Sequence, residues 1–197
     1  MHGQLAAFAG GPTMSPDFVD FIKEGILSLP QNLKAALRLV DDPEIPDDGR
    51  IAIAGALLHW LSGSNSIPGM RGPLALVDDV LMLRLAYEKV EAIAPEAMAR
   101  HREDSPEIFG QLAEEMALVR DTLGAGVQVL EKALEKMPKI KHQGLTAAQC
   151  VHEEDAGTEL YEEVQTAMVD LELEDDEVGR AVKGLGQLVE NLRSRVG

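Results

Sequence analysis

The chain has 197 residues, enough for one compact domain or a domain with a helical extension, and too few for a large multidomain enzyme. Apolar residues make up 45% of it and aromatic residues only 4%, so the predicted core is aliphatic. Asp and Glu total 34 against 18 Lys and Arg, and the net charge of −16 disfavours binding to nucleic acid or anionic membranes. A basic protein partner or a cation suits this charge better.

The cysteine content and the apolar stretches bear on where the protein resides. Cys150 is the only cysteine, which forbids an internal disulfide and favours a reducing compartment. The N-terminus lacks the basic flank and long apolar run of a secretory signal. The longest apolar stretch, residues 51–61, is too short to cross a bilayer, which needs about 20 residues. We therefore expect a cytoplasmic protein without membrane insertion, in which residues 51–61 form a buried helix.

Proline and N-capping residues divide the first half of the chain into helices. Residues 1–14 are expected to be a flexible leader. Ser15-Pro16-Asp17 then combines an N-cap, a proline at the first helical position and an early acidic residue, which together predict a helix start. Similar signals predict helical segments at about 16–29, 31–40, 50–61, 73–93 and from 95 onward. The run 62–69 is dense in turn formers and is predicted to be a loop.

The second half opens with the same kind of signal, Ser105-Pro106-Glu107. The helix that it starts is expected to reach Met137 and carries a heptad-like apolar seam with one irregular step. That step falls beside Gly124 and Gly126, which predict a close helix contact or a bend. Residues 139–157 lack a helical period and are expected to be a connection. Two further apolar stripes, at 160–171 and 178–192, predict a pair of helices joined by an acidic run.

These elements predict an all-α protein, with a multi-helix orthogonal bundle followed by a helical hairpin or small antiparallel bundle. We expect three parts: the leader 1–14, a helical unit at 15–104 and an acidic helical bundle at 105–197. From residue 151 onward there are 13 acidic and only 4 basic residues, so the last part carries more than half of the net charge.

Residues 41–90 contain a recognisable order of motifs. Asp42-Pro43-Glu44-Ile45-Pro46 is followed by the apolar helix, by Ile67-Pro68 and by Leu76-Val77-Asp78-Asp79. This order resembles the YkvA-like family, a widespread bacterial domain of unknown function. Its members typically carry Ser-Pro-x-Asp-x-Ile-Pro-Asp in the loop where this chain has Asn65 and Gly69 in place of two carboxylates. The departure weakens any metal or acid-base role for the loop, and Asn65 is expected to reach Asp78 or Asp79 by a hydrogen bond.

Two pairs of adjacent aspartates are the candidate metal ligands, because hard divalent cations prefer clusters of carboxylate oxygens. Asp47-Asp48 and Asp78-Asp79 flank the same helix-loop-helix unit, so the pairs are expected to be near each other. Adjacent residues of a helix point about 100° apart, so one aspartate of each pair is expected to face inward. The simpler interpretation is that Asp78 shapes and caps the corner. No cofactor other than a divalent metal is expected.

The other reactive residue types form weaker candidates. His59 at the end of the buried helix is typical of a hydrogen-bonded core residue. Cys150-Val151-His152 lacks the second cysteine of a zinc set and the third member of a catalytic group. Phosphate-binding loops, nucleophile elbows and zinc-protease motifs do not occur in the sequence. An enzyme is therefore the less favoured interpretation.

We predict a non-catalytic helical module for protein-protein interaction. The partner is expected to bind an apolar stripe or an acidic face, and the seam is compatible with a homo-oligomer. A metal-binding or metal-dependent hydrolytic domain using Asp78 and Asp79 is one alternative, and an acidic immunity or inhibitor protein covering a basic active site is another. The candidate interaction residues are Leu112, Met116, Val119 and Leu123 of the seam, and the acidic Glu174, Asp175, Asp176 and Glu177.

Overall fold

The computed structural model describes residues 14–67, 69–171 and 173–196, so the predicted leader lies outside them except for Met14. Within these ranges the chain is all-α, as predicted, and its β structure is one pair of two-residue strands. No helix in the same ranges is long and apolar enough to cross a membrane.

The helices follow one another with short connections. The first half forms α1 (Pro16–Leu27), α2 (Leu29–Asp41), α3 (Asp47–Leu61), the 3-10 helix η1 (Gly72–Ala75), α4 (Leu76–Ile93) and α5 (Pro95–Asp104). The second half forms α6 (Pro106–Phe109), α7 (Leu112–Leu123), η2 (Gly124–Gly126), α8 (Val127–Leu134), η3 (Met137–Lys139), β1 (Lys141–His142), β2 (Leu145–Thr146), α9 (Ala147–His152), α10 (Glu154–Val169), α11 (Asp175–Ala181), η4 (Val182–Gly184) and α12 (Gly186–Arg193).

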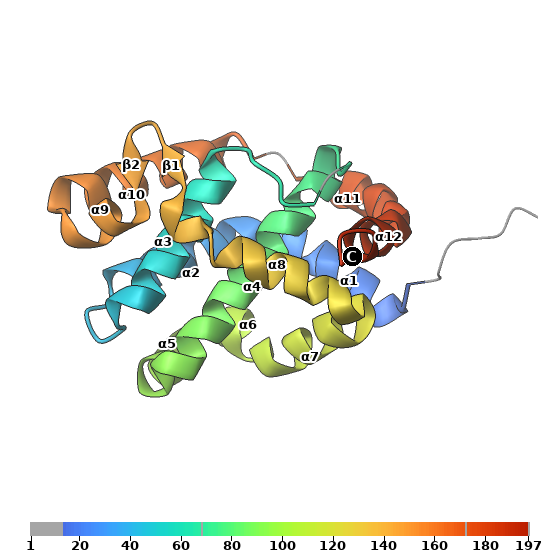
Figure 1. The fold of residues 1–197 in the computed structure, drawn as a ribbon, viewed down its shortest axis with the longest axis horizontal. Helices are drawn as coiled ribbons and strands as arrows, with labels where there is room; N and C mark the ends of the chain where they lie inside the picture. The colour runs from blue at the N-terminus through green and yellow to red at the C-terminus, as the bar shows by residue number, and fades with distance from the viewer. Residues whose placement is uncertain (1–13, 68, 172, 197) are drawn as a thin grey trace, which may run out of the picture.

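Helices α3 and α4 lie side by side at the centre of the molecule (Figure 1). Helix α3 also packs against α2, α9 and η3, while α4 packs against α1, α7 and α8. Residues 52–59 of α3 and 77–87 of α4 are all buried, which confirms the buried helix predicted at 51–61. Both central helices are thus enclosed by the rest of the chain.

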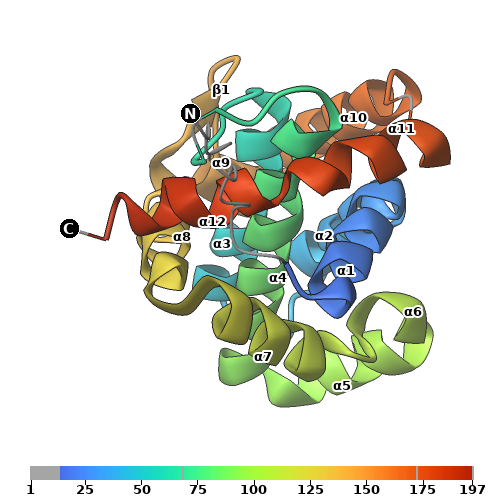
Figure 2. The same ribbon diagram turned by 90° about the vertical axis from the view of Figure 1, so that its right-hand side faces the viewer.

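The C-terminal helices cover the two ends of this centre. Helix α10 packs against α2, α3 and α9, whereas α11 packs against α1 and η1, and α12 against α7 and η2. Figure 1 shows α10 and α12 at opposite ends, and Figure 2 shows α12 crossing in front of α4. The predicted pairing of the last two helical segments with each other is therefore not confirmed. One hydrophobic cluster includes residues from both sides of the boundary predicted at residue 104.

The long helix predicted from Pro106 to Met137 is divided in the structure. The 3-10 helix η2 separates α7 from α8, and Gly124 has a φ of 54°, a conformation that favours glycine. A Cβ atom added at Gly126 would lie 3.1 Å from Cβ of Leu192 on α12. Both predicted consequences of this glycine pair are therefore present, a bend at Gly124 and a close helix contact at Gly126.

The segment 139–157 contains more structure than its composition predicts. Strands β1 and β2 pair antiparallel, and the turn between them holds Gln143 with a φ of 48° and Gly144 with a φ of 95°. Two consecutive residues with positive φ match the twist of a tight hairpin. Thr146 then caps α9 by accepting a hydrogen bond from the Gln149 backbone N–H at 3.3 Å.

Gly55 of α3 allows the backbone of η3 to approach closely. A Cβ atom built there would lie 2.7 Å from the carbonyl carbon and 2.8 Å from the carbonyl oxygen of Met137. We expect Gly55→Ala to lower the free energy of unfolding by about 2 kcal/mol in urea titrations, because backbone atoms must shift. The control is Gly179→Ala in α11, where the nearest atom is 3.8 Å away; alanine there should stabilise by up to about 1 kcal/mol. Equal effects of the two substitutions would contradict the close approach.

Candidate functional site

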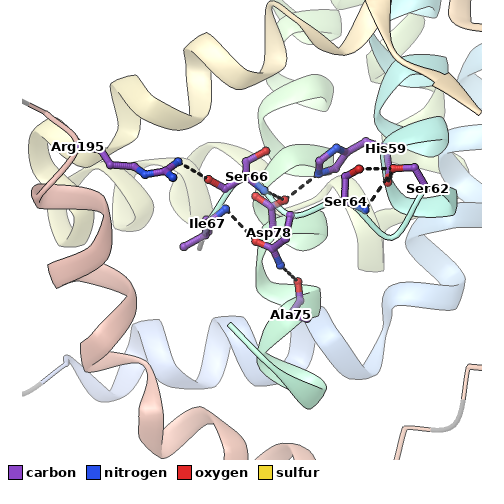
Figure 3. Close-up of polar contacts among 9 residues, drawn as sticks. His59, Ser62, Ser64, Ser66, Ile67, Ala75, Asp78 and Arg195 are labelled. Carbon is purple, nitrogen blue, oxygen red and sulfur yellow. Dashed lines mark hydrogen bonds and ion pairs between the residues drawn. The ribbon is translucent and has the colours of Figure 1, made fainter. Parts of the chain in front are cut away.

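A buried hydrogen-bonded corner joins the end of α3 to the start of α4 (Figure 3). His59 Nε2 lies 2.7 Å from Asp78 Oδ2, and the exposed fractions of these residues are 4% and 0%. The same carboxylate oxygen accepts the backbone N–H of Ser66 at 2.7 Å. Asp78 therefore fixes the imidazole and the loop together, as in the predicted corner-shaping role.

The loop supplies further bonds of its own. Asn65 Nδ2 donates to the carbonyl oxygen of Ala75 at 2.8 Å, and Asn65 Oδ1 accepts the backbone N–H of Ile67 at 2.8 Å. Asn65 therefore bridges the loop to the end of η1 and does not bond to Asp78 or Asp79, contrary to the sequence-based expectation. The backbone of Ser66 takes that place, and backbone contacts of this kind leave no signature in residue type.

Asp79 is buried next to Asp78 in the first turn of α4, with an exposed fraction of 7%. The expectation that only one of two adjacent aspartates faces inward is wrong here, because α4 is enclosed around most of its circumference. Burial, reinforced by the negative charge of Asp78, raises the pKa of Asp79 to about 8. The Oδ1 atoms of both aspartates have no hydrogen-bond partner among the described residues.

The second aspartate pair lies elsewhere. Asp47 and Asp48 are exposed in the first turn of α3, whereas His59, which contacts Asp78, is in its last turn. Twelve residues of helix separate Asp47 from His59 by roughly 18 Å, so the two pairs do not converge. Among the residues that the structure describes, no three His, Cys, Asp or Glu side chains are placed to hold a metal ion. Metal binding by Asp78 and Asp79 stays a prediction.

Cys150 is a poor nucleophile in this setting. Its side chain is buried, and burial raises the pKa of the thiol to about 11. His152 is exposed, and its Nε2 lies 3.6 Å from Asp47 Oδ2. The thiol therefore stays protonated near neutral pH, where a catalytic cysteine would need the thiolate.

The predicted interaction residues fall into two groups with opposite exposure. The seam residues Leu112, Met116, Val119 and Leu123 are at most 3% exposed, so they belong to the core and not to a free apolar stripe. Residues 174–177 are all exposed at the start of α11. One of them, Asp175, forms an ion pair with Lys23 of α1 at 2.9 Å.

Helix α10 adds a longer acidic surface next in sequence to that run. Between residues 153 and 177 there are twelve acidic residues and no Lys or Arg. Asp155, Glu159 and Glu162 follow each other at four and three residues, which places their side chains on one face of α10. All three are exposed, and none forms an ion pair with a described residue. The absence of basic residues from this stretch was the available signal for the face.

Comparison of the chain with protein-family models, with curated proteins and with solved structures found no match. The resemblance of residues 41–90 to the YkvA-like family therefore stays a prediction. The fold and site define an all-α protein with a closed polar corner at its centre and a strongly acidic outer helix.

Proposed function

We propose that this protein is a non-catalytic helical module that binds a basic protein partner through the outer face of α10. The observation that carries the proposal is the row Asp155, Glu159 and Glu162, exposed on one face of a helix that contains no basic residue. An inhibitor that covers a basic active site would be one form of this function.

The charge on α10 is unfavourable for the isolated helix. Like charges three and four residues apart repel each other by about 0.2–0.5 kcal/mol per pair. Glu163, which is partly buried, has His142 Nε2 3.2 Å from its Oε2, but the three outer carboxylates form no ion pair with a described residue. A partner with Lys and Arg side chains at matching spacing would relieve the repulsion and would associate quickly at low salt.

An apolar residue extends the same face. Val169, seven residues after Glu162, is 82% exposed at the end of α10. Tyr161 lies at the flank of the face with an exposed fraction of 50%. Apolar and aromatic contacts surrounded by charge are typical of interfaces, in which charges select the partner and apolar contacts hold it.

A matched pair of triple variants tests the proposal. Asp155→Asn/Glu159→Gln/Glu162→Gln removes the row on α10, and Asp17→Asn/Asp20→Asn/Glu24→Gln removes another exposed row of the same charge on α1. Each is used as bait in extracts of the native cell, and captured proteins are quantified by mass spectrometry.

We expect a basic protein to be captured by the wild type and by the α1 variant, and to be reduced about tenfold or more with the α10 variant, a loss of about 1.4 kcal/mol in binding. The captured protein should also dissociate as salt is raised. Equal capture by both variants, or an acidic captured partner, would refute the proposal.

A further inference from the structure

A cavity of about 620 Å³ lies beside the His59–Asp78 corner, separate from the acidic face of α10. It is open to solvent and is lined by residues of α8 and η3, by residues 64–66 of the loop and by Arg195, which follows α12. Its volume falls in the range of pockets that bind small molecules, about 300–1,000 Å³. Figure 3 shows Arg195, Ser66 and His59 succeeding one another across this region.

The charged side chains around the cavity are all basic. Lys132, Lys136 and Arg195 line it, and no Asp or Glu is among its described lining residues. This is the reverse of the whole chain, in which acidic residues outnumber basic ones by 34 to 18. Lys132 and Lys136 are one helical turn apart and form no ion pair with any residue that the structure describes. Two unpaired like charges at this spacing repel each other.

Helix α8 and the two residues that follow it carry their acidic and basic side chains on different sides. Glu131 and Glu135 line a different groove, between α4 and α8, and Glu131 lies 3.8 Å from Arg120. The acidic residues that could have neutralised the two lysines therefore face away from the cavity. The cavity is positively charged because the lysines line it and the neighbouring glutamates do not, although this segment carries both kinds of charge.

The corner positions one of the three cations. Arg195 donates from Nη1 to the backbone carbonyl oxygen of Ser66 at 3.2 Å, and the N–H of the same residue is held by Asp78. One residue thus connects a fully buried carboxylate to a guanidinium at the cavity rim. Apolar side chains share the lining with these cations, among them Val129 of α8 and Ile140 after η3.

From this arrangement we propose that the cavity binds a small organic phosphate, with the phosphate among Lys132, Lys136 and Arg195 and the organic part against the apolar side chains of the lining. A phosphate monoester carries close to two negative charges at neutral pH and offers three acceptor oxygens, which three cations can neutralise and bond. The guanidinium of Arg195 matches the geometry of phosphate oxygens. The proposal is independent of the acidic face of α10 and of its partner.

Phenyl phosphate is the probe. Inorganic phosphate is the comparison compound without an organic part, and benzoate is the one that keeps the ring but has a single negative charge. Binding is measured by calorimetry and by backbone amide chemical shifts on the full chain. We expect saturable binding of phenyl phosphate, shifts concentrated at residues 64–66 and 129–137, and affinities for the two comparison compounds about tenfold weaker.

The variant Lys132→Gln/Lys136→Gln should weaken phenyl phosphate binding about tenfold or more, whereas Lys34→Gln/Lys183→Gln, which removes two exposed lysines outside the cavity, should leave it within about twofold. Circular dichroism checks that both variants fold. The proposal is overturned by an absence of saturable binding up to about 10 mM, by equal losses in the two variants, or by benzoate binding as tightly as phenyl phosphate.

Discussion

Replacement of Asp79 by asparagine is expected to stabilise the protein, and the gain should grow with pH. The pKa of Asp79 rises from 3.8 to about 8 on folding, so the folded state binds this proton more tightly than the unfolded state does. Between these values, each rise of one pH unit removes up to about 1.4 kcal/mol of the wild type's unfolding free energy through this group. Asparagine has no such proton, so its advantage increases from pH 5 to pH 8 and then levels off.

Urea unfolding of both proteins at pH 5, 7 and 9 measures this difference. The control is Asp20→Asn on the exposed surface of α1, which should change the unfolding free energy by less than about 0.5 kcal/mol at every pH. If the Asp79 and Asp20 variants show the same pH dependence relative to the wild type, Asp79 does not carry a raised pKa in the folded protein.

Replacement of Arg84 by methionine should cost about 3 kcal/mol of unfolding free energy, because it breaks an ion pair between a buried guanidinium and a partly buried carboxylate and removes a buried hydrogen bond to Asn32. Arg84 Nε lies 2.7 Å from Glu115 Oε2, and its Nη1 donates to Asn32 Oδ1 at 2.6 Å. The hydroxyl of Tyr87 donates to the backbone carbonyl oxygen of Asn32 at 2.7 Å. Methionine would leave both the Glu115 carboxylate and the Asn32 oxygen without their cationic partner.

Two further variants test the cause of that loss. Arg84→Met/Glu115→Leu should recover much of the stability, since it leaves no unpaired charge, and the remaining loss should come from Asn32 Oδ1, which still lacks its donor. Arg120→Met breaks an ion pair with Glu88 that is 43% and 36% exposed, and should cost less than about 1 kcal/mol. The measurement is again urea unfolding, and a loss for Arg84→Met no greater than for Arg120→Met would show that burial does not set the value of this pair.

Helix starts were predictable where the chemistry is local. Ser15 caps α1 by accepting the backbone N–H of Phe18 at 3.3 Å, and Pro106 begins α6 as its position predicts. Ser105 behaves differently, because its hydroxyl accepts a hydrogen bond from Arg38 at 2.7 Å and does not cap the helix. The distant arginine could not be inferred from the residues around Ser105.

The candidate site depended more on long-range packing. The residue types of His59 and Asp78 were noted in the sequence, but their pairing across 19 residues depends on how α3 meets α4. The burial of both Asp78 and Asp79 follows from the enclosure of α4, which its own sequence pattern does not reveal. The cavity joins α8 to Arg195, near the end of the described chain, a contact that no local pattern specifies.

The most direct test of a binding function on α10 is zero-length carbodiimide cross-linking in native extract, followed by mass spectrometry of the linked peptides. The reagent joins carboxylates to lysines in direct contact, so it reports which acidic residues touch the partner. We predict cross-links from Asp155, Glu159 or Glu162 to lysines of a single basic protein. Cross-links confined to other acidic surfaces, such as Asp17, Asp20 and Glu24 of α1, would contradict the proposed function.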